Sequence, residues 1–440
     1  MPERQISGGG SSSLSSTDAL LAEATAGMEL DPLPVEEDMM VESVDRNGFA
    51  PVPIAMRPWD RITQHGPPAD PIPFSEPRIF RGRRQNVLCY CNNHDEAGRP
   101  LKDVLFRVGD DYQRAYWALP YKEPIKTIMG HVQVCVVLTR YVSVKDSDDD
   151  SDSENEDDDD EIVFQMTSEF VAIKVNYWSH MQQLRGRHAE DPMKEISAMQ
   201  IIGNQHPNVL GCTEVLVDNE NNVNVILPFL NGGDLFQVLQ ESQRSVKPGM
   251  NEGLARFWFR QVCAGLQHLH AVGICHRDLS PENVMIDGKR ACLIIDMGMA
   301  LRVPYSDPHD PTGVVDVAQG TQKRLVKPQG ACGKLPYMSP EIYRNQDAFD
   351  GGAVDVWTAG TILFCMLTGN RSYQRAHRSD PQFYYMTRDL PLLLADWRVE
   401  LTPEAVDLLK GMMQVDPRDR LTLEEVLAHP WFSHPDIEPE

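Results

Sequence analysis

The stretch His276-Arg277-Asp278-Leu279-Ser280-Pro281-Glu282-Asn283 is the most informative segment of this 440-residue chain. It places a carboxylate, Asp278, and an amide, Asn283, five positions apart in one short loop. Phosphoryl transfer needs a carboxylate at the accepting hydroxyl and an amide oxygen on magnesium. A further carboxylate, Asp296, follows the apolar run 292–295. A turn at the end of a strand explains each aspartate singly, but it does not explain the set.

Upstream of this loop, a lysine and a glutamate form a second pair. Val171-Ala172-Ile173-Lys174 closes an apolar strand with an ammonium group, and Glu195 lies in a helix that Asp191-Pro192 begins. The tetrapeptide alone is a weak signal, because a lysine at the end of an apolar strand is usually just solvated. Its value comes from its place ahead of the loop 276–283.

Together these motifs resemble the eukaryotic protein kinase family of the serine/threonine type, from about Tyr121 to Phe432. The resemblance implies an α+β fold with two lobes, a small β-rich N-lobe and a larger helical C-lobe. It also implies an enzyme that uses ATP and Mg²⁺. The implied roles are Asp278 as catalytic base, Lys174 on the phosphates with Glu195 orienting it, and Asn283 and Asp296 as metal ligands.

Other segments agree with the resemblance. Ser339-Pro340-Glu341 matches the end of the family's activation segment, and the family joins the positions of Glu341 and Arg420 in a buried ion pair. Residues 232–236 and 429–432 are similar to the calcium/calmodulin-dependent kinases. Only eight residues follow Phe432, so the C-terminal regulatory region of that group is not expected.

For the nucleotide, the resemblance implies that Pro228 offers a carbonyl and Leu230 an N–H to the adenine, and that Asp234 meets the ribose. The glycine-rich phosphate loop is nearly absent. If Gly130 is its first glycine, other residues replace the remaining glycines and Val137 packs on the adenine. Side chains in this loop hinder close approach to phosphate. A catalytically inactive scaffold with weak ATP binding is therefore the alternative function.

A lysine near the base is also displaced from its usual position. Serine/threonine kinases usually carry lysine two residues after the catalytic aspartate and threonine after a glycine of the substrate-facing loop, whereas this chain has Ser280 and Lys334. We hypothesise that the ammonium group has changed places, so that Lys334 reaches the γ-phosphate and Asp278 while Ser280 supplies the hydroxyl. The alternative is an ordinary surface lysine.

Activation through the usual phosphothreonine is excluded if the alignment holds, because Gly330 stands at that position. Arg277, which commonly binds such a phosphate, is then a candidate partner for phosphorylated Thr321 or Thr312.

The expected substrate is a protein with a serine or threonine acceptor. Tyrosine kinases usually show another pattern where this chain has Ser280-Pro281-Glu282. Glu282 and Asp234 match acidic positions that in some relatives favour a basic residue near the acceptor.

The net charge of -24 lies mainly outside the folded part, since residues 146–161 hold 12 carboxylates and no Lys or Arg. This acidic insert is expected to be a solvated loop between two strands, and a regulatory or partner-binding role is the alternative. Nucleic-acid binding and membrane anchoring are not expected. The nine scattered cysteines and the lack of an apolar signal segment favour an intracellular protein, cytoplasmic or nuclear.

The expected organisation has four parts: a disordered Ser/Gly/Pro-rich acidic tail at 1–75, an extension of unknown structure at 76–120, a kinase domain with the acidic insert at 121–433, and a short tail at 434–440. Within the extension, residues 86–90 and 104–108 are candidates for extra strands.

Overall fold

The computed structural model describes residues 66–90, 99–109, 113–141, 163–184, 191–243, 249–307 and 309–439. The expected disordered tail lies outside the described residues except for its last ten positions, 66–75. The acidic insert 146–161 lies wholly outside them.

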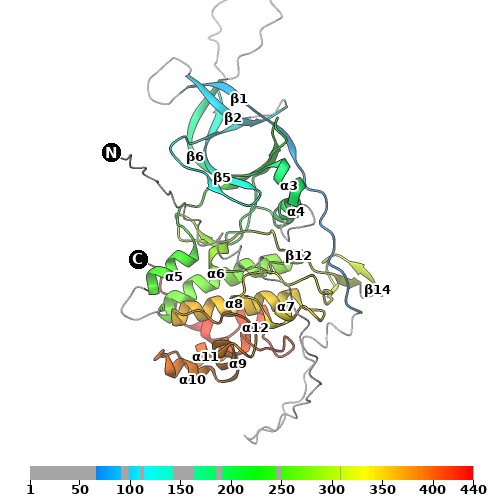
Figure 1. Cartoon of the computed structure of the whole chain (residues 1–440), viewed down its shortest axis with the longest axis vertical. Helices are drawn as coiled ribbons and strands as arrows, with labels where there is room; N and C mark the ends of the chain where they lie inside the picture. Colours follow the sequence, from blue (N-terminus) through cyan, green and yellow to red (C-terminus); the bar gives the residue numbers. More distant parts are fainter. Residues whose placement is uncertain are drawn as a thin grey trace, which may run out of the picture. The chain divides into compact units, whose positions relative to one another are not determined.

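The smaller lobe is an eight-stranded sheet in the order β3-β2-β1-β7-β8-β6-β5-β4. Strand β3 also pairs with β5, so the sheet closes on itself around the ring visible at the top of Figure 1. Closure leaves few unpaired strand edges. The strands are β1 (Phe80–Tyr90), β2 (Arg99–Arg107), β3 (Arg114–Ala118), β4 (Ile125–Lys126), β5 (Gly130–Arg140), β6 (Val163–Asn176), β7 (Glu214–Val217) and β8 (Val223–Pro228).

Residues 80–118 supply the first three strands of this sheet. Val104, Leu105 and Phe106 of β2 are buried against neighbouring strands. The candidate strands at 86–90 and 104–108 lie in β1 and at β2, and the sheet continues across the boundary expected at residue 121.

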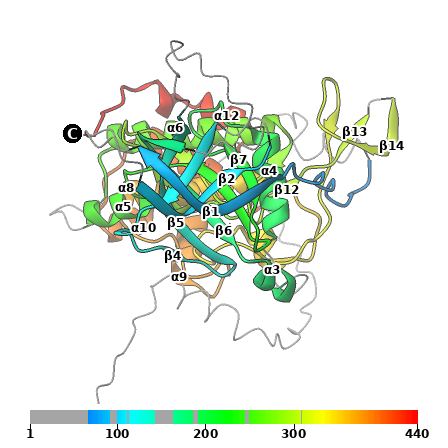
Figure 2. The ribbon, with the colours of Figure 1, turned by 90° about the horizontal axis from the view of Figure 1, so that it is seen from above.

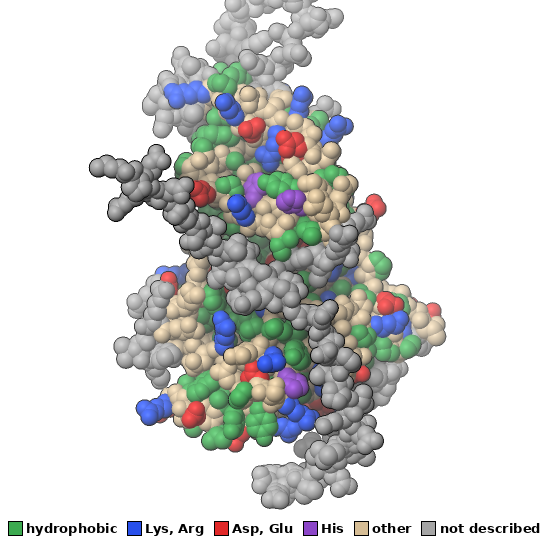
Figure 3. Space-filling model, in the orientation of Figure 1, with side chains coloured by type: hydrophobic (Ala, Val, Ile, Leu, Met, Phe, Trp, Pro, Cys, Tyr) green, Lys and Arg blue, Asp and Glu red, His purple; other side chains and the backbone are tan. Residues whose placement is uncertain are grey.

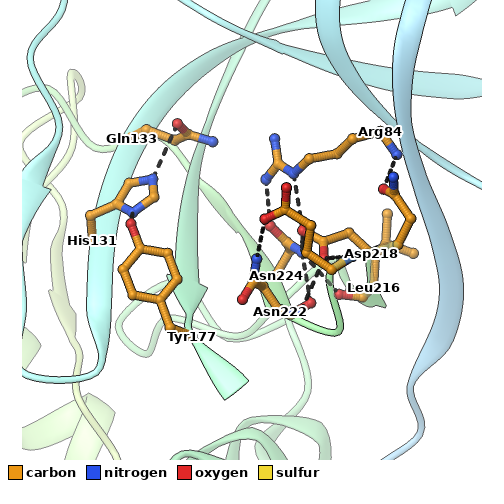
Figure 4. Close-up of polar contacts among 10 residues, drawn as sticks. Arg84, His131, Gln133, Tyr177, Leu216, Asp218, Asn222 and Asn224 are labelled. Atoms are coloured by element: carbon orange, nitrogen blue, oxygen red, sulfur yellow. Dashed lines mark hydrogen bonds and ion pairs between the residues drawn. The ribbon is translucent and has the colours of Figure 1, made fainter. Parts of the chain in front are cut away.

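A polar network fastens β1 to the turn between β7 and β8 (Figure 4). Arg84 donates from Nε to Asp218 at 3.0 Å and from Nη2 to the amide oxygen of Asn224 at 2.6 Å. Asn224 donates in turn to Asp218 at 3.1 Å, and both of these acceptors are buried. Because unpaired buried polar groups are costly, this network favours one position of β1 on the lobe.

The larger lobe is helical, and one core cluster runs through most of its helices. Four small strands border the loop 276–283. Strand β9 (Ile274–Cys275) pairs with β12 (Leu301–Arg302), and β10 (Val284–Ile286) pairs with β11 (Cys292–Ile294). The helices are α3 (Trp178–Leu184) and α4 (Pro192–Ile202), which precede β7, and then α5 (Leu235–Gln243), α6 (Glu252–Ala271), α7 (Pro340–Arg344), α8 (Gly351–Thr368), α9 (Pro381–Arg388), α10 (Leu390–Asp396), α11 (Pro403–Met412) and α12 (Leu423–Leu427), with the 3-10 turns η1 (Pro281–Asn283) and η2 (Pro430–Ser433).

Helix α8 forms the centre of this lobe. It is the one helix among the described residues that is long and apolar enough to cross a membrane, but 94% of it is buried inside the protein. Burial on this scale is typical of a core helix.

The sheet of the smaller lobe and the helices of the larger lobe together confirm the expected α+β fold with a β-rich and a helical lobe.

A fourth sheet, of β13 (Tyr305–Asp307), β14 (Asp310–Val315) and β15 (Gln322–Lys323), has the order β14-β13-β15. It projects from the larger lobe, and Figure 3 shows acidic and basic side chains side by side on this projection. The described residues that precede β1 pass beside β12 and α4 in both ribbon views (Figures 1 and 2).

Candidate active site

A buried carboxylate at the start of α8 organises the loop that carries Asp278. Asp355, which is fully buried, accepts hydrogen bonds from the backbone N–H groups of His276 and Arg277, both at 2.9 Å. Arg277 has a φ of 67°, which few residues other than glycine adopt. The ring of His276 contacts the carbonyl of Ile295 at 2.9 Å and so ties the loop to the segment before Asp296. The catalytic loop therefore has one defined backbone path.

Asp278 and Asn283 face each other across this loop. The Asn283 amide nitrogen donates to the carbonyl oxygen of Asp278 at 2.7 Å and to its Oδ2 at 3.2 Å. Since the nitrogen is held in this way, the amide oxygen is the Asn283 atom available to a metal ion. Burial raises the pKa of the Asp278 carboxyl, and the ammonium group of Lys334 opposes that rise.

Lys334 lies beside the base, as the exchange hypothesis requires. Its Nζ is 2.6 Å from Oγ of Ser280 and 3.6 Å from a carboxylate oxygen of Glu282. Its backbone N–H donates to Oδ1 of Asp278 at 3.1 Å. Gly333 permits this approach, because it has a φ of 91° and a Cβ there would come within 2.8 Å of the Arg277 carbonyl oxygen.

Asp296 follows β11 in a left-handed conformation with a φ of 65°. Its Oδ1 accepts a hydrogen bond from the N–H of Gly298 at 3.1 Å, and the preceding Ile295 donates to the carbonyl of Asn283 at 3.0 Å. Met297 is fully buried in the main core. Both expected metal ligands are thus held on adjoining, hydrogen-bonded segments.

Lys174 and Glu195 form the expected ion pair between β6 and α4. The ammonium nitrogen lies 2.8 Å from both carboxylate oxygens. Helix α4 begins after Asp191, whose side chain accepts from the N–H of Met193 and caps the helix as the sequence predicted. Burial raises the pKa of Glu195, and the charge of Lys174 opposes this. The charge of Lys174 thus favours the ionised form of this carboxylate.

The expectation for Val137 is wrong. Directly opposite residues of paired strands share a face, and Ala172 and Lys174 of β6 lie opposite Val134 and Val132 of β5. Val137 lies beyond an irregularity in the register and is fully buried in a cluster with Ile173, on the other face of β6. Val134 is therefore the valine beside Ala172 on the Lys174 face, which sequence reasoning missed.

Gly130 has a structural role at the start of β5. It begins β5 opposite Asn176, where a Cβ atom would overlap the carbonyl oxygen of Val175. Its N–H and carbonyl both bond to Thr127, so residues 127–130 form the tight turn of the hairpin β4–β5. The glycine thus allows two strands to approach, and its place as the first glycine of a phosphate loop stays a prediction.

The turn is fastened to the residues after β6. Met129 is buried, and its carbonyl accepts from the N–H of Tyr177 at 2.9 Å. The Tyr177 hydroxyl lies 2.8 Å from Nδ1 of His131, whose Nε2 contacts Gln133 at 3.3 Å (Figure 4). Hydrogen bonds and a buried side chain fix this loop, where the family uses glycines.

The expected adenine segment ends β8. Pro228 pairs with Val171 at the end of β8, and no described residue accepts a hydrogen bond from the N–H of Leu230. Asp234 accepts from the N–H of Gln237 at 2.8 Å at the start of α5, and burial raises its pKa. A Cβ on Gly232 would meet the Ile286 carbonyl at 2.8 Å, so a glycine is needed where this segment crosses β10.

Arg277 bonds to backbone carbonyls in the activation segment, residues 296–341. It donates to Gly330 at 3.3 Å and to Met299 at 3.4 Å. The hydroxyls of Thr321 and Thr312 bond to Ala318 and Asp310, within their own turns. Phosphorylation of either threonine remains a prediction.

At the end of the activation segment, Glu341 and Arg420 form the expected buried ion pair. The two guanidinium nitrogens lie 2.7 and 3.0 Å from the carboxylate oxygens. Arg420 also donates to the carbonyl of Ala353 on α8 at 2.7 Å.

Comparisons with known proteins agree with this geometry. Residues 161–432, more than half of the chain, match the family described as "Protein kinase domain". The chain is 31% identical over 274 residues to the SNF-related serine/threonine-protein kinase of Homo sapiens, which covers 62% of this chain and 31% of that protein. It is 34% identical over 208 residues to the serine/threonine-protein kinase CHK1 of Mycosarcoma maydis, covering 47% of this chain and 28% of that protein.

The CBL-interacting serine/threonine-protein kinase 16 of Arabidopsis thaliana is 28% identical over 271 residues, covering 60% of this chain and 52% of the relative. The chain thus spans between about a quarter and half of the length of the curated relatives that it matches.

Proposed function

The chain belongs to the protein kinase family, and we propose that it is an active serine/threonine kinase that transfers the γ-phosphoryl group of ATP to a protein hydroxyl. One observation carries this proposal: Lys174 is paired with Glu195 while Asp278, held by Asn283, lies in the same site as Asp296. A protein that had lost this chemistry would have no need to keep five charged or polar groups so arranged.

The donor set fits ATP and Mg²⁺. Hard oxygen ligands suit magnesium, and the amide oxygen of Asn283 and the carboxylate of Asp296 would hold it. Lys174 would bind the α- and β-phosphates, Leu230 and Pro228 the adenine, and Asp234 the ribose. When bound, ATP supplies the phosphoryl group and Mg²⁺ neutralises its charge.

The residues of this chain then act on the acceptor. Asp278 accepts the proton of the attacking hydroxyl, and its raised pKa makes it a stronger base than an ordinary aspartate. Lys334 neutralises negative charge beside Asp278 and towards the γ-phosphate, while Ser280 fixes the ammonium group at 2.6 Å. Lys334 thereby takes the part that a lysine at position 280 plays in relatives.

The proposed acceptor is a serine or threonine in a protein, with a basic residue nearby. Asp234 and Glu282 are the acidic groups that favour such a residue, and Glu282 shares its charge with Lys334 at 3.6 Å. The eight cysteines within the described residues are all free thiols, which supports action inside the cell, in the cytoplasm or nucleus.

The alternative is a scaffold with weak ATP binding. The turn at 127–130 favours it, because residues other than glycine stand where the family's loop has glycines, and Met129 in this turn is buried and bonded to Tyr177. The intact groups around Asp278 favour the enzyme.

A phosphotransfer assay separates the two. Purified full-length protein is incubated with Mg²⁺, γ-labelled ATP and a mixture of generic protein substrates, followed by phosphoamino-acid analysis, beside Asp278→Asn. Labelled phosphoserine or phosphothreonine is expected, and Asp278→Asn should lower kcat by about 10² to 10⁴-fold. Nucleotide binding without any transfer by the wild type would instead identify the scaffold.

A further inference from the structure

A proline-rich segment, residues 66–79, which we call the strap, lies against both lobes. It runs from beside β14, past β12 and α4, to the start of β1 (Figures 1 and 2). Proline fixes φ and so lowers the entropy lost when an extended segment docks. The strap has five prolines in 14 residues: Pro67, Pro68, Pro71, Pro73 and Pro77.

The first part of the strap is bonded to the activation segment. Arg324, which is buried, donates from Nε and Nη2 to the carbonyl of Pro67 at 2.9 and 2.6 Å. Ala69 donates to the carbonyl of Leu325 at 3.0 Å and accepts from the N–H of Lys327 at 2.9 Å. The strap therefore adds a short parallel pairing to residues 325–327.

The middle of the strap is bonded to β12, which follows Asp296 closely. The N–H of Ile72 donates to the carbonyl of Arg302 at 3.1 Å. The guanidinium group of Arg302 donates back to the carbonyl of Pro73 at 2.9 Å. Ile72 lies between two prolines, which have no N–H. Its N–H is therefore the only backbone donor of these three residues, and it is the one that bonds to Arg302.

The last part is bonded to α4, the helix of Glu195. The buried hydroxyl of Ser197 donates to the carbonyl of Ser75 at 2.8 Å. The side-chain amide of Gln200 pairs with both backbone groups of Arg78, each at 2.7 Å. Phe74 and Ile79 pack against the main core. The strap thus bonds to α4 at two positions on one face of the helix, Ser197 and Gln200, which lie about one turn apart.

The activation segment continues this connection to the catalytic loop. Val326, next to the pairing with Ala69, exchanges both backbone hydrogen bonds with Phe349 at 2.8 and 2.9 Å. The guanidinium carbon of Arg277 lies 5.5 Å from the centre of the Phe349 ring. The strap is therefore linked to both the residue before Asp278 and the helix of Glu195.

Among the described residues, no hydrogen bond joins Arg277 directly to α4. Gly330 cannot be phosphorylated, and Arg277 donates to backbone carbonyls. Burial and the charge of Arg277 both lower the pKa of Lys194 on α4, so the helix presents a like charge towards the arginine. The carboxylate of Asp191 opposes this fall in the pKa of Lys194.

We propose that the strap positions α4 and the activation segment for phosphoryl transfer and takes the place of an activation-loop phosphate. This inference rests on the proposed kinase activity. The strap residues do not touch the reacting groups. They fix the position of the Lys174–Glu195 pair relative to the Asp278 loop through their bonds to α4, β12 and residues 324–327.

The test uses two matched pairs of variants in the full-length chain. Ile72→Pro removes the N–H that bonds to Arg302, whereas Ile72→Ala loses the same side chain and keeps the N–H. Gln200→Ala removes both bonds to Arg78, whereas Gln205→Ala removes an exposed glutamine that bonds only to its neighbour Asn204. Wild type treated with phosphatase is assayed beside them.

We expect Ile72→Pro to have a kcat at least tenfold below that of Ile72→Ala, and Gln200→Ala about threefold or more below Gln205→Ala. The KM for substrate should change less than twofold in each pair, and phosphatase should not lower wild-type activity. Hydrogen exchange in α4 should become faster in both variants. If Ile72→Pro does not fold, the glutamine pair decides alone, because Gln200 is exposed on a helix where alanine is favourable.

Equal kcat values within each pair would overturn the proposal, as would a wild type that phosphatase inactivates. If the strap had a purely structural role, Ile72→Pro and Gln200→Ala would lower the melting temperature and leave kcat unchanged. A wild type that binds ATP but transfers no phosphate would contradict the proposed function instead.

Discussion

The ammonium nitrogen of Lys334 lies 2.6 Å from the hydroxyl oxygen of Ser280, and the backbone N–H of the same lysine donates to Asp278 at 3.1 Å. Two residues 54 positions apart in the chain thus occupy one place beside the base. In relatives, lysine and threonine share this place in the opposite order. We infer from these contacts that the two chain segments have exchanged side chains while the chemistry is kept.

The pH dependence of kcat should report on this arrangement. Burial raises the pKa of Asp278, and the Lys334 charge opposes the rise. The base works only when ionised, so activity falls as the pH drops through this pKa. Lys334→Met removes the opposing charge, raises the pKa further and should move the acid limb of the kcat profile to higher pH. Lys334→Arg keeps the charge and should move it less. Identical acid limbs in all three proteins would contradict the electrostatic role.

Lys174 and Glu195 should behave as one unit. Lys174→Met leaves a buried carboxylate whose pKa is already raised by burial, and Glu195→Gln leaves the ammonium group without its orienting partner. We expect each single variant to lower kcat/KM for ATP by about 10²-fold and the double variant to be little worse, because interacting groups are not additive. Lys122→Met, at an exposed lysine, is the control. Fully additive losses would show that the pair does not act together.

Breaking the ion pair of Arg420 with Glu341 should strongly destabilise the larger lobe. Arg420→Ala leaves a buried carboxylate unpaired, which typically costs about 3–5 kcal/mol. Arg418→Ala, two residues away, removes an arginine whose side chain is 46% exposed and pairs with Asp416. Exposed pairs contribute about 0–1 kcal/mol. Urea denaturation of both variants measures the difference, and a similar loss of unfolding free energy in both would refute the assignment.

Much of the site could be predicted because its residues lie in short sequence motifs. The loop 276–283 contains both the base and Asn283, and the structure brings Asp296, Lys174, Glu195 and Lys334 to the same site. Short motifs fix side chains relative to their own backbone, so their chemistry can be recognised before the fold is known.

The strand register could not be predicted in the same way. The irregularity between Val136 and Leu138 shifts the pairing with β6, and a one-residue shift moves a side chain to the other face. Val137 was therefore assigned to the wrong face, and Val134 was missed. The glycine at 130 was interpreted through the family's pattern, whereas its position is set by the approach of Val175.

The strap and strands β1 to β3 left only weak signals. The strap is bonded largely through backbone N–H and carbonyl groups, which do not depend on the identity of the side chain, so no side-chain periodicity marks it. Strands β1 and β2 are closed into the sheet by partners far along the chain, such as Asp218 for Arg84. Such long-range pairing is decided by tertiary packing and not by local sequence.

The exchange of positions between Lys334 and Ser280 is tested most directly by kcat in two variants of the full-length protein. Lys334→Thr removes the ammonium group and should lower kcat by about 10²-fold, as for the loss of one charge-stabilising donor. The double variant Ser280→Lys with Lys334→Thr restores the usual order of the family and should recover at least tenfold of that loss. Wild-type activity in the single variant, with no gain in the double variant, would contradict the exchange.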